Sequence, residues 1–308
     1  MSPGHWQRYL LTVAYHGKYF VGFAKQPRSY GASIERILHQ AYFDFIGAGN
    51  FRDPQGSSRT DSGVHAFGNT AHVDLIRKHK KTGNTLEPHS PATVQKALNF
   101  YIKTPHLSVS NCVAVPSDFH ARYSCTGRTY LYRILVPLSE MGRNVFDQDY
   151  AWICENKKMP LNVNAMKVAA NSLEGKHDFS TFRSSGCQAS SPVKSLHSLT
   201  VSERIFQLPE SNLRSSSEDV FGQYEHFRLA GNGHVMQEVL VKAHAPSFLY
   251  HQVRNLVGFL VSVGRHDGHA LDVESALAAK SRDACPLTAP PEGLALARVH
   301  YDGEDLDL

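Results

Sequence analysis

The residues best able to do chemistry lie in one stretch, SSRTDSGVHAFGN, which runs from Ser57 to Asn69. Asp61 is a candidate acid or nucleophile, and Gly63, two residues later, permits a tight backbone path. Arg59 could keep a nearby carboxylate ionised, or could hold a phosphate or the edge of a base. His65 could bond to the loop or to a substrate. A turn in which an Asp caps backbone N–H groups would also explain an isolated D-x-G sequence, so these residues alone do not define a reaction.

Two further polar side chains lie in strongly patterned segments. Tyr130 belongs to RTYLYRILV, which predicts a strand, and Arg254 belongs to SFLYHQVRNLVGFLVSVG, the strongest helical pattern of the chain. Taken alone, the first could be a tyrosine packed in a sheet and the second an arginine on a helix surface. Basic residues that could contact a nucleic-acid backbone, or could simply be solvated, are Arg77, Lys78, Lys80, Lys81, Arg122, Arg128 and Arg133.

Composition limits the class of protein. The chain has 308 residues, 42% of them hydrophobic and 19% charged, which predicts one large or two ordinary globular domains. The net charge of +4 is compatible with a polyanionic partner. Five cysteines without a C-x-x-C pair favour neither a zinc cluster nor a disulfide framework, and so favour an intracellular location. We expect no membrane span, because the longest apolar run is interrupted by polar residues.

The elements that must position these residues alternate between strands and helices. Residues 1–115 predict strand, helix, strand, helix and strand, with helices that begin after Ser33 and at Pro91. The second half repeats this order loosely, with a helix near Ala165–Leu173 and a closing strand in LALARVHY. Such an order predicts an α+β fold with helices on one face of a sheet.

SSRTDSGVHA resembles the signature of the TruA family of tRNA pseudouridine synthases, whose usual form is close to G-R-T-D-A-G-V-H-A. Further blocks resemble those of the family in the same order, and together they span nearly the whole chain: YLLTVAYHGKYFVGF, FHARYSCTGRTYLYRI, GKHDFSTFRSSGC, SPVKSL, SFLYHQVRNLVGFLVSVG and APPEGLALARVHYD.

The resemblance implies an α+β fold of two similar ferredoxin-like halves. They would form a mostly antiparallel sheet with helices on one face and a central RNA-binding cleft. We expect residues 1–115 to form the half that carries the aspartate loop, and residues 116–308 the half that carries the Tyr and Arg motifs. A flexible insertion is expected near residues 206–235, and the sequence looks similar to the eukaryotic pseudouridine synthase-like branch.

The resemblance also implies roles for single residues. Asp61 matches the catalytic aspartate, and Tyr130 matches the tyrosine that stacks on the target base and is proposed to help remove its C5 proton. Arg254 matches the basic residue that pairs with the aspartate. Arg59 matches an arginine that holds or flips the nucleotide, and His65 is a further candidate for substrate binding.

The implied activity is isomerisation of uridine to pseudouridine in the anticodon stem-loop, at about tRNA positions 38–40, after the nucleotide has left its stack. No nicotinamide or flavin is expected, because the reaction has no redox step, and no metal is expected, because the sequence shows no strong metal-binding cluster. The family acts as a homodimer on tRNA. We expect an intracellular location, cytoplasmic or mitochondrial.

Two alternatives fit parts of the pattern. A catalytically inactive RNA-binding or tRNA-chaperone protein could have the same fold, although binding alone needs no carboxylate that faces RNA phosphates. A hydrolase that releases the base commonly uses a second acid near the first. No such acid lies beside Asp61 in the sequence.

Overall fold

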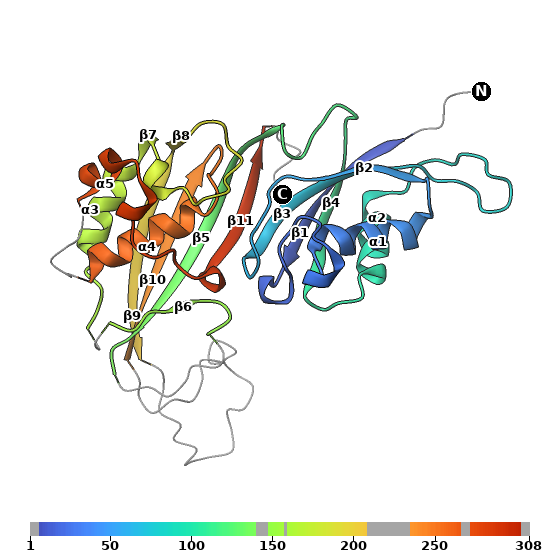
Figure 1. Cartoon of the computed structure of the whole chain (residues 1–308). Helices are drawn as coiled ribbons and strands as arrows, with labels where there is room; N and C mark the ends of the chain where they lie inside the picture. The colour runs from blue at the N-terminus through green and yellow to red at the C-terminus, as the bar shows by residue number, and fades with distance from the viewer. Residues whose placement is uncertain (1–5, 140–146, 157–158, 208–234, 266–271, 303–308) are drawn as a thin grey trace, which may run out of the picture. The chain divides into compact units, whose positions relative to one another are not determined.

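The computed structural model describes residues 6–139, 147–156, 159–207, 235–265 and 272–302 (Figure 1). The chain forms two compact units. Unit 1 comprises Met1–Leu131, His244–Ser247 and Leu294–Leu308, and unit 2 comprises Tyr132–Ala243 and Phe248–Gly293. The insertion that we expected near residues 206–235 lies almost entirely outside the described residues.

Unit 1 is built on a sheet whose strands run in the order β4, β1, β3 and β11. Strand β1 pairs antiparallel with both β3 and β4, whereas β11 pairs parallel with β3. A short strand, β2, pairs with β3, and the first part of β5 also belongs to this unit. The strands are β1 (Gln7–Tyr15), β2 (Phe51–Gly56), β3 (His65–Leu75), β4 (Leu107–Val115), β5 (Cys125–Pro137) and β11 (Leu294–Tyr301).

Two helices cover one face of the sheet of unit 1, α1 (Ile34–Ile46) and α2 (Pro91–Tyr101) (Figure 1). Alternate residues of β1, namely Tyr9, Leu11 and Val13, pack with apolar residues of both helices in a single buried cluster. Since successive side chains of a strand point to opposite faces, the residues between them face away from the helices. The side chain of Ser90 accepts a hydrogen bond from the Thr93 N–H and caps α2.

Unit 2 continues β5 and adds β10 and β9, which follow it in strand order. A separate two-stranded sheet pairs β7 with β8. The elements are β6 (Trp152–Ile153), α3 (Val163–Leu173), β7 (Gly175–Asp178), β8 (Val193–Leu196), β9 (Ser198–Gln207), β10 (Val235–Ala245), α4 (Gln252–Gly264) and α5 (Val273–Ala279).

The predicted mixed fold, with a mostly antiparallel sheet and helices, is confirmed. Strand β2 was not predicted, and its residues include Pro54 and Asp53, the latter with a positive φ of 50°. Such residues are rare in regular strands, and β2 indeed shifts register between Arg52 and Gln55. The predicted strand in VKSLHSLTVSERI is two strands, which separate at His197. Among the described residues, no helix has the length and apolar character needed to cross a membrane.

Candidate active site

The segment that links β2 to β3 is held by alternate residues. Ser58 and Thr60 are buried, whereas Arg59 is exposed and Asp61 is half-buried. The Asn69 amide donates to the Ser58 carbonyl oxygen at 3.0 Å, and the Thr60 hydroxyl lies 2.7 Å from the Tyr15 hydroxyl. Inward residues therefore anchor the loop, and the residues with chemical potential lie between the anchors.

A tight turn follows Asp61. The Val64 N–H donates to the Asp61 carbonyl oxygen at 3.2 Å, and Gly63 between them has a φ of +82°, a conformation that suits glycine. The turn is packed against Gly17, where an added Cβ would lie 2.2 Å from the Val64 carbonyl oxygen. Both glycines are therefore required by the path of the loop.

Tyr130 lies on β5 and is half-buried against the helix-covered core of unit 1. Burial raises the pKa of Tyr130 to about 12, while the Arg128 charge and a hydrogen bond with Ser58 oppose the rise and the Asp61 charge adds to it. The phenol is therefore neutral near pH 7, and the carboxylate of Asp61 contributes to its raised pKa. The charge of Asp61 thus acts on the Tyr130 hydroxyl, and both residues belong to unit 1.

Two of the basic residues suggested as RNA contacts have partners within the protein. Arg128 donates to oxygens of Ser57, Ser58 and Pro246. Arg133 donates to Asp147 and Glu238 at 2.6 Å each. These bonds fix both guanidinium groups against protein atoms, which the sequence did not indicate.

His65, the first residue of β3, is buried. Its Nδ1 accepts the Gly17 N–H at 3.1 Å, and its ring meets the edge of His16 with centroids 4.8 Å apart. The contact to Gly17 ties the aspartate loop to the turn after β1. The role of His65 in substrate binding stays a prediction, as does that of the exposed Arg59.

Arg254 lies in the first turn of α4, in unit 2. Its Nε donates to the Ala289 carbonyl oxygen at 2.7 Å, and the Ala289 N–H donates back to the Arg254 carbonyl oxygen at 3.2 Å. The helix begins after His251, which has a φ of +61°, and Leu249 lies before it rather than within it as predicted. The pairing of Arg254 with Asp61 stays a prediction.

Comparison with known proteins identifies the family. A family model described as tRNA pseudouridine synthase matches residues 169–302. tRNA pseudouridine synthase A of Rhodospirillum rubrum is 37% identical over 297 residues, which cover 96% of this chain and 88% of that protein. The proteins of the same name from Bartonella quintana and Rhodospirillum centenum are each 37% identical, over 99% and 100% of their lengths. The chain belongs to the TruA family of tRNA pseudouridine synthases.

Membership of the TruA family makes the chain an isomerase. The side chains that sequence analysis missed are those that hold the aspartate loop, among them Tyr15, Asn69 and Arg128. The sequence did contain one indication that this loop is held by the protein. The small polar residues Ser58 and Thr60 alternate with Arg59 and Asp61, as expected for a segment that packs one side against its support.

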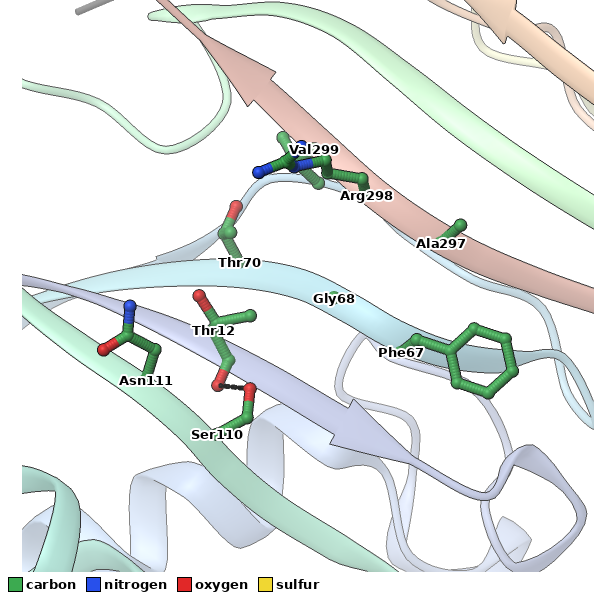
Figure 2. A pocket seen from close by; sticks show the side chains of 9 residues that line it. All are labelled: Thr12, Phe67, Gly68, Thr70, Ser110, Asn111, Ala297, Arg298 and Val299. Atoms are coloured by element: carbon green, nitrogen blue, oxygen red, sulfur yellow. Dashed lines mark hydrogen bonds between the residues drawn. The ribbon is translucent and has the colours of Figure 1, made fainter. Parts of the chain in front are cut away.

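A pocket of about 260 Å³ lies elsewhere in unit 1, on the sheet face opposite the helices (Figure 2). Thr12 Oγ1 is buried there and has no hydrogen-bond partner among the described residues, while Phe67 is 60% exposed. None of the predicted catalytic residues of this TruA-family chain lines the pocket. Its lining residues are Thr12, Phe67, Gly68, Thr70, Ser110, Asn111, Ala297, Arg298 and Val299.

Proposed function

We propose that the chain converts uridine to pseudouridine in tRNA, at about positions 38–40 of the anticodon stem-loop, on a nucleotide that has left its stack. The observation that carries this proposal is the half-buried Asp61, presented by an anchored loop in the neighbourhood of Tyr130. Relatives that match over nearly their whole length, and that are named tRNA pseudouridine synthase A, support tRNA as the substrate.

Asp61 is the proposed catalytic group. The reaction breaks the N1–C1′ bond, turns the uracil, and joins C5 to C1′, while the C5 proton leaves and N1 gains one, so the product is an isomer of the substrate. A carboxylate is suited to trap or steer an electron-poor sugar carbon, as in glycosidases. Nothing in this balance requires an electron donor or acceptor.

Tyr130 and Arg59 are the proposed partners of the extruded nucleotide. A half-buried ring supplies a stacking face for a base outside its helix. Its neutral phenol favours stacking and hydrogen bonding over proton abstraction, because a pKa of about 12 leaves almost no phenolate near pH 7. The exposed Arg59, two residues before Asp61, is suited to hold a phosphate or the displaced nucleotide.

The proposal extends to assembly and location. A homodimer is proposed from the family resemblance. An intracellular location, cytoplasmic or mitochondrial, is proposed from the five cysteines without a C-x-x-C pair. Membership of the eukaryotic branch is proposed from the long polar segment near residues 206–235.

The test is a map of pseudouridine after reaction of the purified chain with unmodified tRNA transcripts. We expect carbodiimide-reactive residues only in the anticodon stem-loop, and none with Asp61→Ala, whose affinity for tRNA should stay within several-fold of wild type. Modification at other positions would contradict the proposed target. Turnover by Asp61→Ala would remove Asp61 from its role.

A further inference from the structure

We infer that Arg128 is a positioning residue, which fixes the chain leading into Asp61 and the ring of Tyr130 relative to each other. The inference rests on the proposed catalytic role of Asp61. It assigns Arg128 a task on the protein side of the site, in place of the RNA contact that the sequence suggested.

The contacts of Arg128 converge on the start of the aspartate loop. Nε donates to the Ser58 hydroxyl at 2.7 Å, and Nη2 donates to the Ser57 carbonyl oxygen at 3.1 Å and to the Ser57 hydroxyl at 3.3 Å. Nη1 donates in another direction, to the Pro246 carbonyl oxygen at 2.7 Å. One planar group therefore ties two successive loop residues to a third segment of unit 1.

These acceptors are neutral, and both serines are buried. A hydrogen bond from a charged donor is stronger than one between neutral groups, so the loop is held firmly. Ser57 is further fixed on its other side, because its N–H donates to the Thr70 carbonyl oxygen at 2.8 Å. The direction in which the chain leaves β2 toward Asp61 is thus set before the turn begins.

Tyr130 is linked to the same point. It lies two residues after Arg128 on β5, and alternate residues of a strand point to the same face. The Tyr130 hydroxyl forms a hydrogen bond with Ser58, whose hydroxyl also accepts the hydrogen bond from Arg128 Nε. Ser58 is therefore the common contact through which Arg128 couples the position of the ring to that of the loop.

The experiment compares Arg128→Lys and Arg128→Met with Arg8→Lys as a matched control. Arg8 also ties a loop of unit 1 to a strand, since it donates to the Phe119 carbonyl oxygen at 2.7 Å and to Asp74, but it does so away from the aspartate loop. Single-turnover rates at saturating tRNA, tRNA dissociation constants and melting temperatures are measured for all variants.

We expect both Arg128 variants to lose single-turnover rate by roughly 10- to 100-fold, because a small misplacement of a catalytic group has effects of that order. Their dissociation constants should stay within about threefold of wild type, because the guanidinium bonds protein rather than RNA. Arg8→Lys should lower the melting temperature and leave the rate within about twofold. The lysine ammonium cannot donate in the several fixed directions of the planar guanidinium. Arg128→Lys should therefore be only partly more active than Arg128→Met.

Ser58→Ala provides a second, smaller change at the common contact. If Arg128 acts through Ser58, the double variant should lose little more rate than Arg128→Met alone. Wild-type single-turnover rates in folded Arg128→Met would overturn the inference, as would a loss confined to tRNA affinity. Asp61→Asn separates the two proposals. If Asp61→Asn stays active, the proposed role of Asp61 is wrong. If Asp61→Asn is inactive and Arg128→Met is fully active, only the inference about Arg128 is wrong.

Discussion

At the scale of the residue, the protonation of Tyr130 limits what it can do. Burial raises its pKa to about 12, and the nearby Asp61 charge adds to the rise. A neutral phenol can stack, and it can share the hydrogen bond with Ser58, but it is a weak base at neutral pH. We therefore propose that the site uses the ring of Tyr130 rather than its ionisation.

Substitution of Tyr130 tests this distinction. Tyr130→Phe should keep the stacking face and lose less than about tenfold in single-turnover rate, the cost of one hydrogen bond being about 1 kcal/mol. Tyr130→Leu should lose roughly 5- to 150-fold, since base stacking on an aromatic ring is worth about 1–3 kcal/mol. Equal losses in Phe and Leu would instead assign proton transfer to the hydroxyl, and wild-type rates in both would make the ring dispensable.

At the scale of the element, strand β3 carries different groups on its two faces. Ala71 and Val73 pack into the helix-covered core, whereas His72 and Asp74 face the opposite side. His72 is buried, and its Nδ1 accepts the Ala121 N–H at 3.0 Å. Only a neutral imidazole can accept at this nitrogen, so the contact between β3 and the segment before β5 depends on pH.

Acid should weaken this contact. Burial, with the charges of Arg8 and His120, lowers the pKa of His72 to about 4 from 6.5, and Asp74 and Asp53 oppose the shift. The folded state therefore favours neutral His72. Its contribution is complete above pH 6.5 and is lost as the pH falls toward 4.

Urea unfolding at pH 7 and pH 4.5 measures the effect. His72→Asn keeps an acceptor for the Ala121 N–H and cannot titrate, so it should lose less stability over this interval than wild type, by roughly 1–3 kcal/mol. Other titrating groups are shared by the two proteins and cancel in the comparison. Equal losses in both would show that His72 does not govern the acid response.

At the scale of the whole molecule, the chain divides its candidate residues between two units. Asp61, Tyr130 and Arg128 belong to unit 1, and Arg254 belongs to unit 2. Unit 1 is completed by β11 from the end of the chain. The predicted pairing of Arg254 with Asp61 therefore involves one residue from each unit.

Arg254→Lys tests this pairing. The Nε bond to Ala289 fixes the plane of the guanidinium, and an ammonium on a flexible stem cannot keep that bond and also present a planar fork. We expect a folded protein, with a melting temperature close to wild type, that loses at least about tenfold in rate. Wild-type rates would argue against a close pair.

The sequence by itself determined most of the element order and the reactive stretch. Periodicity predicted α1, α4 and β11, because apolar residues recur at the spacing of a strand or a helix face. The composition of the stretch around Asp61, together with the matching blocks, indicated the family.

The tertiary structure alone decided which polar residues bond within the protein and which are exposed. Arg128 and Arg122 are equivalent in sequence as basic residues near β5, yet the first is turned onto Ser57 and Ser58 and the second is exposed. The missed strand β2 likewise forms because β3 provides a partner for residues that have little strand preference of their own. Such contacts join residues far apart in the chain, so no local pattern of side chains could have specified them.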